Sequence, residues 1–188
     1  MTITKLAGPA GGTAAISRSV PFLLSRGPLA VSPMGGAAPI ETSQPLQLFV
    51  VKLSDITDEG FIKKAVPVGW RYLIVGQGPL AVADVKEAAG VQQASLSSLI
   101  RGPLVERLSQ AAELAEQKYS DDPNSFEVRI LEIPSLYITA LWLHGPRDIF
   151  IPFLEGAPQE GAAVAEDPSF LSRVVAKATE KRRPLATP

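Results

Sequence analysis

Residues 136–143, LYITALWL, constrain the fold of this chain more than any other stretch. In an extended strand, successive side chains point to opposite faces, and here both alternating sets are mainly apolar. Such a strand belongs inside a sheet that is covered on both faces. The chain must therefore place apolar elements on two sides of one sheet, or leave one face for a partner to cover.

The order of the other patterns predicts an α+β fold. Strand-like runs come first, a helix follows, more strand-like runs come next, and a second helix ends the pattern. Because strands and helices do not alternate strictly, we predict a single compact domain with a mainly antiparallel sheet packed by about two helices. A doubly wound parallel sheet fits this order less well.

Both helices are predicted from the spacing of apolar residues. In Pro103–Tyr119, apolar residues recur every three or four positions, and Pro103 suits the first helical position because its missing N–H costs nothing there. A second helix is predicted over Pro168–Glu180. Its buried side is expected to carry Phe170, Leu171, Val174, Val175 and Ala178.

The strand-like runs carry further local signals. Alternation in FEVRI (126–130) predicts one wet face, and a change of phase through Leu131–Ile133 predicts a bulge. Pro152 predicts an edge position for DIFIPF (148–153), and HGPRD (144–148) is typical of a hairpin loop. The runs LQLFVVKL (46–53) and WRYLIV (70–75) predict strands, whereas PLAVADV (79–85) fits either a strand or the start of a helix.

The first 45 residues differ in composition from the rest of the chain. More than half are Gly, Pro, Ala, Ser or Thr, and the recurring prolines argue against any long helix or strand. We predict a flexible N-terminal arm over residues 1–45, a domain over 46–180 and a basic C-terminal tail over 181–188. The acid-poor composition of the arm also leaves an organelle transit peptide open.

Composition excludes several classes of function. The chain has no cysteine and one histidine, which excludes disulfides and thiolate nucleophiles and argues against zinc. We predict no metal or cofactor, with a carboxylate-only Mg²⁺ or Ca²⁺ site as the open alternative. We also predict no transmembrane segment, because no apolar run approaches the roughly 18 residues that a membrane span needs. Net charge is −1, with basic ends around an acidic body, so we expect no specific nucleic-acid partner. We also expect a cytoplasmic location. The basic tail could still contact an anionic surface.

The strand that contains Trp70 leads into the first candidate ligand site. Gly76, Gly78 and Ala81 match G-x-G-x-x-A, a relaxed dinucleotide fingerprint. Pro79 removes a backbone N–H that would face a phosphate, and no acid follows at the spacing expected for the ribose. We interpret this stretch as a corner between sheet elements and keep the ligand site as the alternative.

The second candidate is the loop that follows Trp142. His144 beside Asp148 could form an acid–base pair, with Arg147 as an anion clamp. The alternative is a solvated hairpin turn in which Asp148 accepts local hydrogen bonds. Any catalysis that depends on histidine must use His144.

These residues favour a non-catalytic protein-interaction or structural subunit over an enzyme. We expect it to self-associate or to dock a protein partner through the sheet and the N-terminal arm, because two helices alone leave little cover for the doubly apolar strand. The alternative is a binding module or enzyme for a nucleotide or anionic metabolite. It would use the Gly76–Gly78 turn or the His144–Asp148 loop.

Overall fold

The computed structural model describes residues 2–4, 6–24, 41–76, 79–87, 93–156 and 164–183. The strands are β1 (Thr2–Thr4), β2 (Glu41–Thr42), β3 (Leu46–Val50), β4 (Val66–Val75), β5 (Pro79–Glu87), β6 (Ala94–Ile100), β7 (Ser125–Ile133), β8 (Ile138–His144) and β9 (Ile149–Glu155). The α-helices are α1 (Gly12–Leu24), α2 (Pro103–Tyr119) and α3 (Phe170–Arg182), and the short 3₁₀ turns are η1 (Leu53–Asp55), η2 (Glu59–Lys64) and η3 (Pro134–Leu136).

The described strands form one sheet. Its order is β6-β5-β4-β3-β7-β8-β9, with β1 added beside β7 and β2 beside β4. Neighbours run antiparallel except where β3 and β1 lie parallel to β7. The predicted α+β class with a mainly antiparallel sheet is therefore confirmed.

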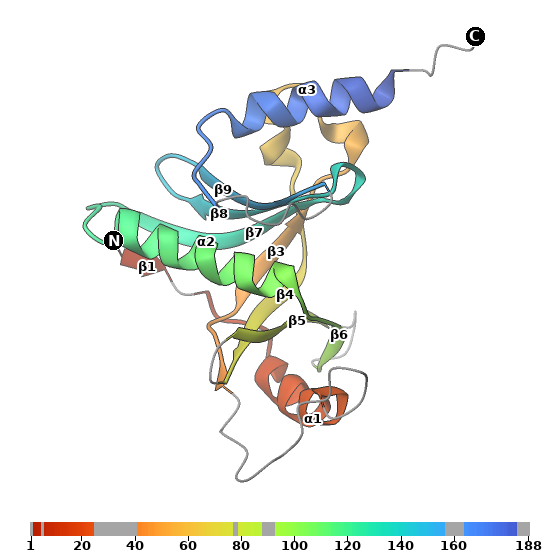
Figure 1. Cartoon of the computed structure of the whole chain (residues 1–188), viewed down its shortest axis with the longest axis vertical. Helices are drawn as coiled ribbons and strands as arrows, with labels where there is room; N and C mark the ends of the chain where they lie inside the picture. The colour runs from red at the N-terminus through yellow and green to blue at the C-terminus, as the bar shows by residue number, and fades with distance from the viewer. Residues whose placement is uncertain are drawn as a thin grey trace.

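The sheet bends around α2 (Figure 1). The apolar side of α2 packs on one face, against residues of β3, β5 and β7–β9. On the other face, α3 covers β7, β8 and β9, and α1 covers β4, β5 and β6. We call these two parts the β7–β9 half and the β4–β6 half. None of the helices in the described part of the chain is long and apolar enough to span a membrane.

Several sequence predictions hold in detail. The helix expected at Pro103–Tyr119 has those bounds, and the second expected helix is α3. Strand β8 is interior and is covered by α2 on one face and α3 on the other, so the chain itself supplies the cover that its sequence demands. Strand β9 is an end strand, as Pro152 predicts, and the ambiguous PLAVADV run is strand β5.

The expectation that prolines exclude a long helix from the first 45 residues is wrong. Helix α1 has 13 residues and includes Pro21. Ile16 and Val20 are buried against β4–β6, and this packing stabilises the helix despite the hydrogen bond that Pro21 cannot donate. Residues 25–40, the central part of the predicted flexible arm, lie outside the described residues.

The predicted bulge at Leu131–Ile133 is also wrong. Strand β7 pairs with β8 and β3 without a register shift. Ile130 faces α2 and Leu131 faces α3, and both are buried, so the apolar run continues on both faces because both are covered. The register shifts lie instead at Leu48/Phe49, Ile74/Val75, Asp84/Val85 and Thr139/Ala140.

Candidate functional site

The structure brings together three of the residues predicted around the β8–β9 hairpin. The Oδ1 atom of Asp148 accepts a hydrogen bond from Nε1 of Trp142 at 2.8 Å and lies 2.7 Å from Nδ1 of His144. If Nδ1 carries the proton toward Asp148, Nε2 of His144 is left as an acceptor. The imidazole is oriented by the carboxylate, and 42% of its side-chain area is exposed.

A second ionic pair lies next to this hairpin. Glu127 is the cross-strand neighbour of His144 and accepts a hydrogen bond from Nε of Arg129 at 2.5 Å. The Arg129 guanidinium carbon lies 4.8 Å from the ring centroids of both Phe49 and Trp142. This stacking holds a mostly buried cation against Trp142, whose ring also contacts the oriented imidazole.

Arg147 does not join this cluster. Its Nη2 atom lies 3.6 Å from Oδ2 of Asp122, and its side chain is largely exposed. Gly145 has a steric role in the same loop, because a Cβ there would lie 2.7 Å from Cδ1 of Phe126. The hairpin therefore presents an Asp–His pair, without the anion clamp that the sequence suggests.

The Gly76 turn lacks the setting of a dinucleotide site. Strand β5 follows it and pairs antiparallel with β4, whereas the fingerprint requires a helix N-terminus after the turn. Gly78 lies outside the described residues. Trp70 lies in β4 and packs in the cluster that α1 covers, whereas Trp142 belongs to the cluster under α3.

Sequence reasoning missed the most buried charged residue in the described part of the chain. Arg71, in β4, is 1% exposed. Its Nε and Nη2 atoms donate to the two carboxylate oxygens of Asp84 at 2.7 and 2.9 Å, and Nη2 lies 2.8 Å from Oε1 of Glu132. Ser98 also donates to Asp84, at 2.9 Å. Among the described residues, Nη1 of Arg71 has no partner.

The surroundings of Arg71 favour its charged form. Burial alone would lower the pKa of its guanidinium, but hydrogen bonds and charges from Asp84 and Glu132 outweigh it and raise the pKa. One signal in the sequence could have revealed this group. Arg71 and Asp84 each interrupt an apolar strand run, and a charge at such a position is usually paired when it is buried.

A cavity of about 300 Å³ adjoins this ionic cluster. Residues of five strands, β3 to β7, line it on the face of the sheet that also carries α2. The lining residues are Leu48, Val50, Val68, Gly69, Asp84, Val85, Lys86, Ser97, Ser98 and Glu132. Apolar walls with a few convergent polar groups are typical of small-ligand sites.

Strand β6 forms a different kind of candidate site, at one end of the sheet. Within the described residues, its backbone hydrogen bonds run to β5 alone. A shallow hollow of about 460 Å³ lies beside it, lined by Leu23, Leu96, Ser97, Ser98, Leu99 and Arg101. Leu23, from α1, is 41% exposed. An exposed sheet edge is the geometry of strand-addition sites.

No family model, curated protein or solved structure matches this chain. Within the described residues, no three His, Cys, Asp or Glu side chains are grouped so that they could hold a metal ion. The candidate sites are therefore the Asp–His pair, the cavity beside Arg71 and the β6 edge, each defined by the geometry of this chain.

Proposed function

We propose that this chain is a non-catalytic interaction subunit that self-associates by antiparallel pairing of β6 with β6 of a second copy. The carrying observation is that β6 ends the sheet and, within the described residues, has a backbone partner on one side only. An edge strand of this kind is a template for pairing with another chain.

The composition of β6 favours a second copy as the partner. Its sequence, ASLSSLI, contains no charged residue and no proline, the residues by which proteins commonly block an exposed edge. A two-fold pairing places the same strand on both sides, so an uncharged strand meets no like charge across the interface. The net charge of −1 adds little repulsion between copies.

Ser95→Glu tests this proposal. Ser95 is exposed and lies opposite Lys86 of β5, so the new carboxylate is compatible with the fold of one chain but places a charge on the proposed interface. Light scattering after size-exclusion chromatography should give a dimer for the wild type and a monomer for Ser95→Glu.

Ser172→Glu is the matched control. It adds the same charge at an exposed position of α3, which covers the other half of the sheet, and should leave the dimer intact. A wild-type chain that stays monomeric at all accessible concentrations would overturn the proposal. A dimer that survives Ser95→Glu would do the same.

A second candidate function is small-ligand binding at the β8–β9 hairpin. One observation favours it: Asp148 orients the half-exposed imidazole of His144. A thermal-shift screen of nucleotides and anionic metabolites would support it if a stabilising compound loses its effect in His144→Ala. A ligand at 100 times its dissociation constant should add about 2.7 kcal/mol of stability.

A cytoplasmic location is also part of the proposal. Fractionation of cells that express the tagged full chain would test this, and recovery in a secreted or organelle fraction would contradict it.

A further inference from the structure

The cavity beside Arg71 has an excess of negative charge on one wall. Two carboxylates, those of Asp84 and Glu132, share the single guanidinium of Arg71. Both Asp84 oxygens accept hydrogen bonds, whereas no described residue donates to Oε2 of Glu132. The Glu132 side chain is partly exposed and lines the cavity, so an ammonium group could reach this oxygen.

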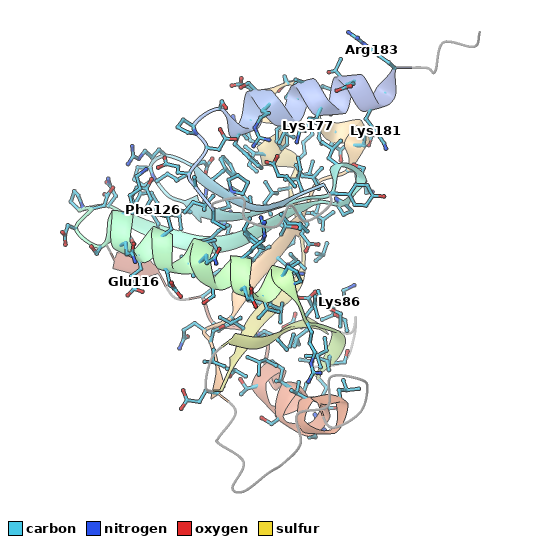
Figure 2. The ribbon with its side chains drawn as sticks, in the orientation of Figure 1. Lys86, Glu116, Phe126, Lys177, Lys181 and Arg183 are labelled. Atoms are coloured by element: carbon cyan, nitrogen blue, oxygen red, sulfur yellow. The ribbon has the colours of Figure 1, made fainter. Side chains whose placement is uncertain are left out.

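A positive charge lies on another wall of the same cavity. Lys86, labelled in Figure 2, is exposed at the end of β5 and forms no ion pair with a described carboxylate. Strands β5 and β7 are separated by β4 and β3, yet one guanidinium touches both Asp84 and Glu132. The bent face therefore brings side chains of β5 and β7 within the span of a small molecule.

The rest of the lining is apolar apart from Ser97 and Ser98. Leu48, Val50 and Val68 line the cavity, and a Cβ at Gly69 would lie 2.8 Å from the carbonyl oxygen of Val85, whose side chain packs on the other face. The glycine thus lets β4 and β5 approach closely beneath the cavity. At about 300 Å³, the cavity lies at the lower end of the range for small-molecule sites.

We propose that this cavity binds a small zwitterion, an α-amino acid with an apolar side chain. The ammonium group pairs with Oε2 of Glu132, the carboxylate pairs with Lys86, and the side chain packs against Leu48, Val50 and Val68. This site adjoins the proposed dimer interface, because Ser97 and Ser98 line the cavity and also belong to β6.

Isothermal titration of the full chain with three related probes tests the proposal. L-leucine carries both charges, 3-methylbutylamine lacks the carboxylate, and 4-methylpentanoate lacks the ammonium. L-leucine should bind about tenfold more tightly than either analogue, since each analogue loses one ion pair. No heat with any probe, or equal affinities for all three, would overturn the proposal.

Two variants test which residue pairs with the carboxylate of the ligand and which pairs with its ammonium group. Lys86→Met should weaken L-leucine binding about tenfold and leave 3-methylbutylamine unchanged. Glu132→Gln should weaken L-leucine similarly and leave 4-methylpentanoate unchanged. Because Glu132 also contacts Arg71, Lys86→Met keeps the test decisive if the other variant is poorly folded.

Lys63→Met is the matched control, because Lys63 is an exposed lysine of η2 that does not line the cavity. It should bind all three probes as the wild type does. Unchanged L-leucine binding in Lys86→Met would overturn the proposal. Light scattering on the same samples reports the dimer separately, so failure of one proposal is distinguishable from failure of the other.

Discussion

The two ends of the sheet are treated in opposite ways. Strand β9 contains Pro152, and its backbone is engaged by other parts of the chain: Asp167 N–H donates to the Phe150 carbonyl at 3.0 Å. Strand β6 contains neither proline nor charge, and no described segment pairs with its outer side. One end of the sheet is blocked, and the other is available for pairing.

The block on β9 depends on α3. Arg173 donates to Glu155 at 2.5 and 2.6 Å and also pairs with Asp167, so it ties the segment before α3 to the end of β9. Lys177 donates to Glu155 at 2.9 Å, and Figure 2 shows it on the side of α3 that faces the sheet. The covering helix thus also secures the neighbouring edge.

The halves also differ in the charges that they bury. In the β4–β6 half, the Arg71 side chain is 2% exposed, whereas Arg173 beside the β7–β9 half is 32% exposed. Beneath α3 the contacts are apolar and include aromatic pairs, with the rings of Phe150 and Phe170 stacked at 4.7 Å. The β7–β9 half, with the blocked edge, combines an apolar interior with partly solvated ion pairs. The β4–β6 half, with the open edge, contains a desolvated ion pair.

The largest expected effect comes from comparing two Asp→Asn variants, one in each half of the sheet. Asp84→Asn leaves the buried Arg71 guanidinium without its main counter-charge and should lower the free energy of unfolding by about 3 kcal/mol. Asp167→Asn removes a carboxylate from the partly exposed Arg173, which retains Glu155, and should lower it by about 1 kcal/mol. Urea denaturation of both variants measures the difference, and equal losses would contradict it.

Much of the fold follows from local sequence patterns. Pro103 and the apolar spacing define α2, the doubly apolar run defines β8, and Pro152 places β9 at an edge. Each of these signals lies within a single element. The apolar residues of α2 and β8 that the signals predict to be buried are buried in the structure. The Asp148–His144 contact is local in the same sense, since its partners are four positions apart in the sequence.

The rest depends on contacts between distant segments. Helix α1 contains Pro21 and gains its stability from packing on β4–β6, which its own sequence does not reveal. The Arg71 cluster joins three strands, and the parallel β3–β7 pairing that brings Glu132 near β4 has no signature in either strand. A single sequence could indicate that Arg71 needs a partner, but not that Asp84 and Glu132 supply it.

The next largest effect should come from releasing the block on β9. Arg173→Met removes the link between Glu155 and Asp167 and should lower the free energy of unfolding by about 1.5 kcal/mol. Hydrogen exchange should also become faster at the Asp167 amide, which bonds the Phe150 carbonyl. Lys63→Met, at an exposed lysine of η2 that is not among the groups bonded to Glu155 or Asp167, should leave both unchanged. Slow exchange at the Asp167 amide in Arg173→Met would show that the edge does not depend on this link.

Acid should weaken the same link to a smaller extent. Burial alone would raise the pKa values of Glu155 and Asp167. Hydrogen bonds from Arg173 and Lys177 outweigh burial at Glu155, and hydrogen bonds from Ser169 and Arg173 outweigh it at Asp167. Both pKa values therefore lie below their ordinary 4.5 and 3.8. Carboxylates with depressed pKa values stabilise the fold fully above their ordinary values and lose this contribution as the pH falls through the folded-state values.

The free energy of unfolding should therefore decline as the pH falls from about 5 to about 3. Arg173→Met should make this decline shallower, by about 1 kcal/mol over the range, because the carboxylates lose the cation that favours their charged forms. Urea denaturation at several pH values measures it, with Lys63→Met as the control. Parallel curves for the wild type and Arg173→Met would contradict the assignment.

The smallest effect is expected at the rim of the β7–β9 half. His144→Ala removes one of two groups bonded to Oδ1 of Asp148, and the Trp142 indole still donates to that oxygen. Because the imidazole is half exposed and the carboxylate keeps a partner, the free energy of unfolding should fall by about 0.5 kcal/mol. The dimer should persist, since this hairpin lies in the half opposite to β6. A loss of the dimer in His144→Ala would show that the two halves are coupled and would remove the distinction between a blocked end and an open one.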